Sequence, residues 1–312
     1  MFALLVGVIK FLFGCGNLLL HPGYNIRGNK VLYKNAFPAG SFEVENADAK
    51  TFKVVDKSND QSNTGFATDK NYVFYSGSMI QGSDGKSFTY INLNFSKDKN
   101  QCYYKAEVIP GADPASFNVK ADVFSADKNH IYKHTTVVDN DPSVFESFDS
   151  SRIVRTANAV SVFGKIIPLE KSTSFKHFRF NFYAINEQVY FQNDSLWDAD
   201  AASFKVLTEY FAVSNKHVYY GERLVKNADP KTFKPLAAPY GKDAAHVFFF
   251  ERTIEGADPK TFEILNTAFQ CSRDKNTAYH EDKPIKNITV EDMANKKKCN
   301  QCNASAIYFE EK

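Results

Sequence analysis

Three near-identical decapeptides decide the fold: DADAASFKVL (198–207), NADPKTFKPL (227–236) and GADPKTFEIL (256–265). Their Phe residues recur every 29 residues, and the series continues in both directions. Its other members are Phe52, Phe88, Phe117, Phe145, Phe175 and, about one period later, Met293. Such a fixed period indicates a tandem-repeat fold, in which a unit too small to fold alone gains its core from its neighbours.

A second block recurs in phase with the first and contains the triplet Asp-Lys-Asn. About nine copies, some diverged, lie between residues 28 and 293. Asp and Asn bond their own local backbone, so the triplet predicts a turn between two strands. A calcium site is the alternative, although one Asp and one Asn per copy fall short of the six to eight oxygens that calcium takes. The clearest copies are TDKNYVFY (68–75), KDKNQCYY (97–104), ADKNHIYK (126–133), SNKHVYY (214–220) and RDKNTAYH (273–280).

The two blocks together resemble the DKNYY family. The resemblance extends over nearly the whole repeat region, residues 21–295. Members of this family are bacterial proteins with no established activity. Their repeats often follow an N-terminal lipoprotein or secretion signal. The resemblance therefore implies an exported bacterial protein, and it transfers no catalytic, metal-binding or ligand-binding residue to this chain.

Each unit is predicted to combine short antiparallel strands with one helical turn. Asp229 is a good N-cap, Pro230 suits the first helical position, and Phe233 and Ala228 occupy the positions of a hydrophobic staple. Aromatic and β-branched residues then predict about three strands per unit, with no room for a crossover helix. The predicted fold is all-β, an elongated β-solenoid or hairpin array over 21–295. A closed propeller is the alternative, although propeller blades are usually longer.

Residues 1–20 read MFALLVGVIKFLFGCGNLLL and are apolar except for Lys10 and Asn17. LFGC (12–15) resembles a lipobox, which predicts a lipoprotein signal and a lipid anchor on Cys15. An ordinary cleaved signal or anchor, and a buried core segment, are the alternatives. A membrane-spanning helix would place Lys10 near the bilayer centre, where a charge is costly. The expected location is the bacterial cell envelope, with the chain anchored to a membrane.

The cysteines near the C-terminus predict a structural disulfide. Cys271 lies close to the last repeat, and CNQC follows it within 296–312, a segment that we expect to be a Lys-rich tail. A bond from Cys271 to Cys299 or to Cys302 would join this tail to the last unit in an oxidising compartment. The sequence does not choose between these two partners. Half of a zinc site, or a redox pair, is the alternative for CNQC.

Charge and motifs favour binding over catalysis. The formal net charge is +2, whereas a nucleic-acid partner would need a larger basic excess. The sequence contains no nucleophile elbow, phosphate loop or zinc-protease motif, so we expect no enzyme activity, no cofactor and no metal. Three His residues share one repeat position, which indicates a structural role: His130, His217 and His246.

Recurrent Tyr residues give the one positive functional signal. They either fill the core or form an exposed face that stacks against glycan rings or contacts a protein. The residues are Tyr72, Tyr75, Tyr103, Tyr104, Tyr132, Tyr190, Tyr219 and Tyr220. We therefore expect a non-enzymatic binding or scaffold module of the cell envelope, whose partner is a protein or a glycan. The alternative is an envelope enzyme acting on glycan or peptide, with its site in the diverged unit at 157–167.

Overall fold

The computed structural model describes residues 23–310 with four short gaps, at 36–39, 58–59, 150 and 171. The predicted anchor segment 1–20, with Cys15, lies outside the described residues. Among the described residues, no helix is long and apolar enough to cross a membrane. The chain divides into two compact units. Unit 1 comprises Met1–Glu146 and Arg155–Ala159, and unit 2 comprises Ser147–Val154 and Val160–Lys312.

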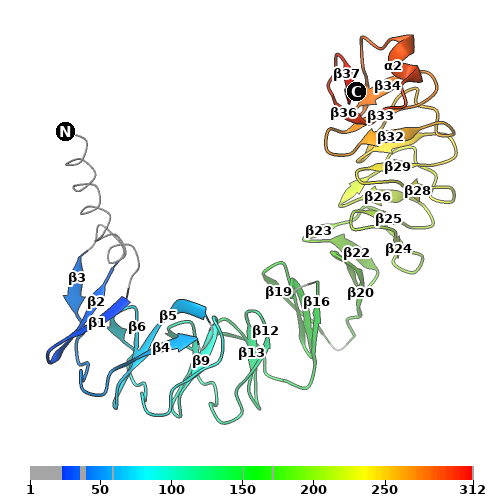
Figure 1. Cartoon of the computed structure of the whole chain (residues 1–312). Coiled ribbons are helices and arrows are strands. Elements are labelled where there is room, and N and C mark those ends of the chain that lie inside the picture. Colours follow the sequence, from blue (N-terminus) through cyan, green and yellow to red (C-terminus); the bar gives the residue numbers. More distant parts are fainter. Residues whose placement is uncertain (1–22, 36–39, 58–59, 150, 171, 311–312) are drawn as a thin grey trace, which may run out of the picture. The chain divides into compact units, whose positions relative to one another are not determined.

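Unit 1 begins with a sheet of three antiparallel strands, β1 (Gly23–Arg27), β2 (Lys30–Lys34) and β3 (Ser41–Glu43). Three four-stranded sheets follow, each made of strands that are consecutive in sequence (Figure 1). Their strands are β4 (Lys53–Lys57), β5 (Asp60–Thr68), β6 (Val73–Tyr75), β7 (Ser78–Met79), β8 (Thr89–Tyr90), β9 (Phe95–Lys97), β10 (Cys102–Tyr104), β11 (Glu107–Val108), β12 (Asn118–Ala121), β13 (Phe124–Ala126), β14 (Ile131–Lys133) and β15 (Thr136–Asp139).

The boundary between the units falls within one four-stranded sheet, β16 (Phe145–Phe148), β17 (Ile153–Thr156), β18 (Ala159–Val162) and β19 (Lys165–Pro168). Unit 2 continues with four more such sheets, a short helix and a two-stranded hairpin. These elements are β20 (Phe175–Arg179), β21 (Phe182–Ile185), β22 (Gln188–Phe191), β23 (Asp194–Ser195), β24 (Lys205–Val206), β25 (Phe211–Val213), β26 (Val218–Tyr220), β27 (Arg223–Leu224), β28 (Lys234–Pro235), β29 (Tyr240–Lys242), β30 (Val247–Phe249), β31 (Arg252–Thr253), β32 (Glu263–Asn266), β33 (Cys271–Arg273), β34 (Ala278–His280), β35 (Lys283–Pro284), α2 (Val290–Ala294), β36 (Cys299–Cys302) and β37 (Ile307–Phe309).

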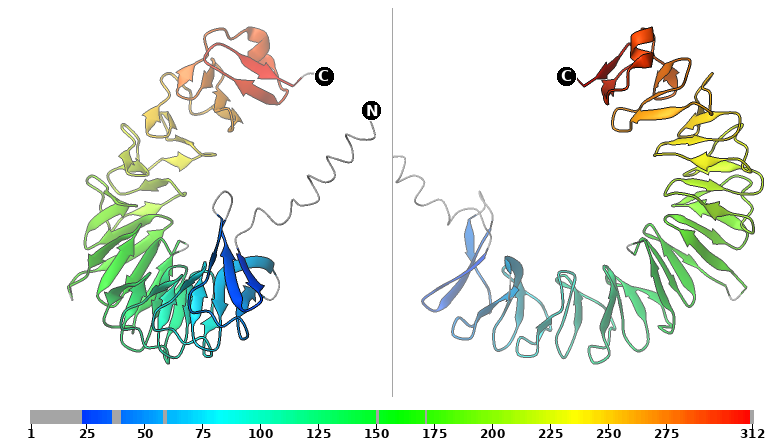
Figure 2. Two further views of the ribbon diagram at one scale, coloured as in Figure 1. Left: turned by 90° about the vertical axis from the view of Figure 1, so that its left-hand side faces the viewer. Right: turned by 45° about the vertical axis from the view of Figure 1, so that its right-hand side comes forward.

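The predicted all-β repeat fold is confirmed. Figure 2 shows that the sheets of each unit follow one another in sequence order, as the coils of a solenoid do. No sheet of the described residues closes into a barrel. Each complete repeat has four strands rather than the predicted three. The additional strand is the one just before the triplet turn, such as β25, which pairs with β24 on one side and with β26 on the other.

The single helical turn predicted before the first strand is present as one hydrogen-bonded turn. The Phe233 N–H donates to the Asp229 carbonyl at 3.0 Å, and the Asp229 side chain accepts bonds from the Lys231 N–H at 3.0 Å and from the Thr232 hydroxyl at 2.7 Å. Asp229 is thus the N-cap that the sequence predicts. The turn stops there because the next residues pair as β28 with β29.

The Phe of each turn fills the space between two neighbouring sheets. The Phe233 ring centroid lies 5.1 Å from that of Phe211 in the preceding sheet and 6.0 Å from that of Phe248 in its own sheet. Burying one such ring stabilises the fold by about 1.5–3 kcal/mol. The predicted Phe series therefore occupies one recurring environment. Equivalent ring triplets are Phe66–Phe88–Tyr103, Phe182–Phe204–Tyr219 and Tyr240–Phe262–Tyr279.

A small residue makes room for each of these rings. A Cβ atom added at Gly241 would lie 2.5 Å from Cζ of Phe233, so no larger residue fits without displacing the ring. Gly241 pairs with Phe248 across β29 and β30. The same pairing of a small residue with an aromatic one recurs in other sheets. The pairs are Ala67–Phe74, Ser96–Tyr103, Ser125–Tyr132, Ala212–Tyr219 and Ser272–Tyr279.

The Asp of each Asp-Lys-Asn triplet is buried and hydrogen-bonded through both oxygens. Oδ1 of Asp127 accepts bonds from the backbone N–H groups of Asn129 at 2.7 Å and His130 at 2.8 Å, which forms the predicted turn. Oδ2 accepts bonds from the Asp113 backbone N–H at 2.9 Å and from the Tyr132 hydroxyl at 2.8 Å. These donors occupy the oxygens that a calcium ion would need. The equivalent backbone bonds are made by Asp69, Asp98, Asp243 and Asp274.

The Lys of the triplet joins the same network. Nζ of Lys128 lies 3.2 Å from Oδ2 of Asp113. The Lys128 backbone N–H donates to the Ser116 hydroxyl at 3.1 Å, and that hydroxyl donates to Asp113 at 2.7 Å. Bonds from Ser116, and then from Lys128, hold the pKa of Asp113 below its ordinary value. We call this set of bonds, centred on Asp127 and Asp113, the Asp latch, because it joins the turn before a sheet to the middle hairpin of that sheet.

The segment 296–312 is more than the tail that the sequence suggests. β36 and β37 form a hairpin whose turn is closed by Asn303, since its Oδ1 accepts bonds from the backbone N–H groups of Ser305 at 2.8 Å and Ala306 at 3.0 Å. Helix α2 stands where the Asp-containing turn stands in other repeats, and Met293 packs at the Phe position. The hairpin of β36 and β37 thus continues the repeat geometry past the expected boundary at 295.

Asp127→Asn is expected to lower the free energy of unfolding by about 1.5–3 kcal/mol at neutral pH, because the new amide N–H₂ group must face groups that are themselves donors. Burial raises the pKa of Asp127, but its hydrogen bonds outweigh burial and hold the pKa below its ordinary value. Its contribution is therefore complete above the unfolded pKa of about 3.9 and is lost as the pH falls through the folded pKa. Urea unfolding at neutral and acidic pH should show the difference from wild type shrinking in acid.

The matched control is Glu107→Gln, which neutralises an exposed carboxylate in the same unit. It should leave the urea midpoint unchanged at both pH values. An equal loss in the two variants, or a loss in Asp127→Asn that is independent of pH, would contradict the role given to the Asp latch.

Candidate functional site

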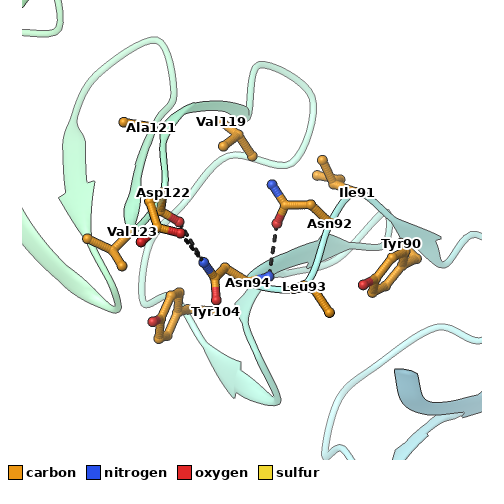
Figure 3. Close-up of a pocket in the computed structure, with 10 residues that line it drawn as sticks. All are labelled: Tyr90, Ile91, Asn92, Leu93, Asn94, Tyr104, Val119, Ala121, Asp122 and Val123. Atoms are coloured by element: carbon orange, nitrogen blue, oxygen red, sulfur yellow. Dashed lines mark hydrogen bonds between the residues drawn. The ribbon is translucent and has the colours of Figure 1, made fainter. Parts of the chain in front are cut away.

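An open depression in unit 1 is the best candidate for a binding site. It has a volume of about 740 Å³ and lies between the loop that joins β8 to β9 and the tight turn that joins β12 to β13 (Figure 3). Two neighbouring repeats therefore form its walls. Its lining is mainly apolar and amide in character. The residues are Tyr90, Ile91, Asn92, Leu93, Asn94, Tyr104, Val119, Ala121, Asp122 and Val123.

Two Asn side chains fix the shape of the loop. Oδ1 of Asn92 accepts bonds from the backbone N–H groups of Asn94 and Phe95, both at 2.9 Å. Nδ2 of Asn94 then crosses to the next repeat and donates to the carbonyl oxygen of Asp122 at 2.8 Å and to its Oδ1 at 2.9 Å (Figure 3). The two walls of the depression are thus joined directly, which favours a preformed site over one that must order on binding.

The rim of the depression is unusually apolar. Leu93 is 67% exposed and Ile91 is 38% exposed. Tyr104 packs against His134, with ring centroids 4.7 Å apart, and presents a half-buried ring to the depression. The Tyr90 hydroxyl is buried and has no hydrogen-bond partner in the part of the chain that the structure describes, and burial raises the pKa of Tyr90. Apolar contacts with a few polar groups suit ligand binding.

The sequence does not predict this loop, although INLN (91–94) carries a signal. Two apolar residues alternate with two Asn residues where a turn is expected, and an exposed Leu contributes nothing to a turn. The predicted Tyr residues divide into two groups. Tyr103, Tyr132 and Tyr219 are fully buried and belong to the core. The half-buried members are Tyr72, Tyr75, Tyr104, Tyr190 and Tyr220.

One His–carboxylate pair lies close in sequence to the diverged unit at 157–167. Nε2 of His177 lies 2.8 Å from Oδ2 of Asp149 and 2.8 Å from the carbonyl oxygen of Phe180, and its ring stacks on Phe148 at 4.5 Å. A His oriented by a carboxylate is part of the apparatus of nucleophilic catalysis. However, no hydroxyl or thiol of the described residues is hydrogen-bonded to His177, so the pair lacks a nucleophile. We therefore interpret the His177–Asp149 pair as a structural contact between β20 and the turn after β16.

Comparison with protein families agrees with the repeated geometry. The model of the DKNYY family matches four overlapping regions, at residues 24–93, 79–136, 95–252 and 240–309. The chain belongs to the DKNYY family. Neither a curated protein nor a solved structure matches the chain. Membership of the DKNYY family accounts for the repeats, including the last hairpin up to residue 309, and it assigns no activity.

The last repeat of this DKNYY protein is joined to the one before it by a disulfide. Of the two partners considered for Cys271, the structure joins Cys302 to it, with Cα atoms 5.8 Å apart. Cys299 remains a buried free thiol in the same apolar cluster, and burial raises its pKa. Because Cys302 is bonded, CNQC does not present the two free thiols that a zinc site or a redox pair requires. Cys102 is also buried, which raises its pKa to about 12.

Cys302→Ser is expected to loosen the terminal hairpin of this DKNYY chain. The bridge spans 31 residues, for which the chain-entropy estimate is about 3–4 kcal/mol. Hydrogen exchange should show faster exchange at the amides of β36 and β37, with little change in unit 1. Cys299→Ser is the matched control, because it removes a buried thiol and leaves the bridge. Similar exchange in Cys302→Ser and wild type would show that the hairpin is held without the disulfide.

Proposed function

We propose that the chain is a non-enzymatic binding or scaffold module of the bacterial cell envelope, held at a membrane by a lipid on Cys15. Its partner is a protein or a glycan of the envelope. A small formal net charge of +2 argues against nucleic acid as that partner. The chemistry of the depression in unit 1 supports binding, and the N-terminal sequence supports the anchor.

The observation that carries the proposal is the preformed, apolar depression with Leu93 at its rim. Exposed apolar side chains that gather around a depression are typical of contact sites, whereas single exposed apolar residues are common on any protein. Here four apolar or aromatic residues from two repeats, Ile91, Leu93, Tyr104 and Val123, line one space. The Asn94–Asp122 bonds hold this space open before any partner arrives.

The use of the carboxylates supports binding rather than catalysis. In the regular repeats, the Asp latch engages the triplet Asp with backbone and hydroxyl donors, as at Asp98, and pairs the turn Asp with a Lys, as Asp84 pairs with Lys99 at 2.8 Å. The hydrogen bond and charge of Lys99, followed by the Ser87 hydroxyl, lower the pKa of Asp84 to about 2. Carboxylates with lowered pKa values are poor general acids at neutral pH. The enzyme alternative, with its site in the diverged unit at 157–167, is supported by the nearby His177–Asp149 pair.

A photo-crosslinking amino acid at Leu93, in bacteria that express the chain, should give a discrete adduct with an envelope component. The reason is that Leu93 lies at the rim of the proposed contact. Adding Ile91→Asp should abolish the adduct, because a carboxylate then stands in the apolar lining. Val290 is 88% exposed and lies in unit 2, so crosslinker at that position is the control and should give no such adduct.

Identical adducts at Leu93 and Val290, or no adduct at Leu93, would reject the site. Release of soluble fragments from isolated cell wall by the wild type, abolished in His177→Ala, would contradict the binding role and favour the enzyme.

The anchor has a separate test. Cells grown with labelled palmitate should incorporate label into the wild-type chain and into Cys299→Ser, but not into Cys15→Ala, because the lipid is attached to the Cys15 sulfur. The label is read on gels of the purified chain. A wild-type chain without label rejects lipidation, and label that persists in Cys15→Ala assigns it to another residue.

A further inference from the structure

Equivalent positions can be compared from one repeat to the next. In this comparison, the repeat that begins with β24 differs from others at its surface. The turn before β24 contains Trp197, the single Trp of the chain, which is 66% exposed. The next residue, Asp198, has φ +49°, and the equivalent Asn46 and Asn227 share this left-handed conformation, with φ +63° and +64°. In the five repeats whose first strands are β4, β8, β12, β28 and β32, a charged, amide or Pro residue stands in place of Trp197. The equivalent residues are Glu45, Gln81, Pro110, Lys226 and Glu255.

The hydrogen bonds around Trp197 differ from those of a regular Asp latch. Ser214 replaces the triplet Asp, so the Tyr219 hydroxyl has no triplet carboxylate to bind and donates instead to the Trp197 carbonyl oxygen at 3.1 Å. Tyr132 shows the regular pattern, since its hydroxyl donates to Asp127. The substitution therefore fixes the backbone of Trp197 to the core through a fully buried ring.

Asp198, the residue after Trp197, pairs with two polar side chains, those of Lys216 and His217. Oδ1 of Asp198 lies 2.7 Å from Nζ of Lys216, and Oδ2 of Asp198 lies 3.2 Å from Nε2 of His217. The His217 ring lies 5.2 Å from the Trp197 ring. These bonds hold the pKa of Asp198 below its ordinary value, chiefly through Lys216 and then His217. The exposed indole thus lies beside an imidazole, which Asp198 links to the ammonium group of Lys216.

This chemistry selects a class of ligand. The charges of Asp198 and Lys216 cancel, so the cluster has little net charge with which to select a cation or an anion. A large exposed indole favours a flat apolar surface, while the bordering groups offer both donors and acceptors. A neutral sugar ring has both properties, because one face carries C–H groups and the rim carries hydroxyls. We propose that Trp197, Asp198, Lys216 and His217 form a platform that binds a sugar ring of a neutral glycan.

This inference rests on the proposed binding role and names glycan as a ligand, at a site in unit 2. Because the chain has a single Trp, its emission reports on this site alone. Titration of the full chain with chitotetraose or with maltotetraose should quench and blue-shift the Trp emission in a saturable way with at least one of the two sugars. A single ring on an open platform binds weakly, with a Kd of about 1 mM. Absence of a saturable change with both sugars overturns the inference.

Variants separate stacking from general adhesion. Saturation-transfer NMR should show that Trp197→Ala abolishes sugar binding and that Trp197→Phe, which keeps a smaller aromatic face, weakens it by about two- to tenfold. Phe269→Ala is the matched control, because Phe269 is exposed in the same unit and lies outside the cluster. It should bind as wild type does. Equal binding by Trp197→Ala and wild type overturns the inference.

The two proposals fail independently. If the chain binds sugar but gives no adduct at Leu93, the platform in unit 2 is supported and the contact site in unit 1 is rejected. If Leu93 gives an adduct but Trp197 emission does not respond to sugar, the contact site is supported and the platform is rejected.

Discussion

The buried carboxylate of each Asp-Lys-Asn triplet is the constraint on which the repeat depends. Burying an ionised carboxylate is strongly unfavourable unless its oxygens are hydrogen-bonded. Asp127 meets this requirement with two N–H groups of its own turn, one N–H group of the turn before the sheet, and a Tyr hydroxyl. The carboxylate can be buried only when both turns are in place. It therefore couples their positions, and with them the position of the Phe that fills the space between sheets.

The repeat in which Ser214 replaces this Asp shows which bonds of the Asp latch remain when the carboxylate is absent. The Ser214 hydroxyl still accepts bonds from the Lys216 and His217 backbone N–H groups, at 3.2 and 3.1 Å. The Ser214 hydroxyl closes the turn without a carboxylate, and the Tyr219 hydroxyl donates to the Trp197 carbonyl oxygen. Departures from a local rule concentrate at functional or strained sites. The repeat in which Ser214 replaces this Asp also exposes the indole of Trp197.

The sequence predicts the features that follow from local rules, and it misses those that depend on contacts between segments. The 29-residue period, the buried Phe residues and the triplet turn follow from spacing and side-chain chemistry, so they could be predicted. The small residue facing each aromatic, such as Gly241 beneath Phe233, depends on how closely two sheets approach, which a single segment does not encode. The sequence does not reveal the last hairpin, for two reasons. Asn303 takes the position of the triplet Asp, and the Cys271–Cys302 bond takes the place of aromatic packing. The depression at Leu93 arises only when two repeats are adjacent.

The backbone of the loop edge explains why binding chemistry can vary there without loss of the fold. Ile91 and Asn92 donate their N–H groups to the Phe95 carbonyl oxygen, and the equivalent Leu207 and Thr208 donate to that of Phe211. The backbone bonds are the same, while the side chains change from an apolar rim to a polar one. Because the Asp latch lies at the opposite turns of each sheet, these side chains are free to change at little cost in stability. The latch therefore fixes the core of each repeat, while the side chains of this loop edge vary from one repeat to the next.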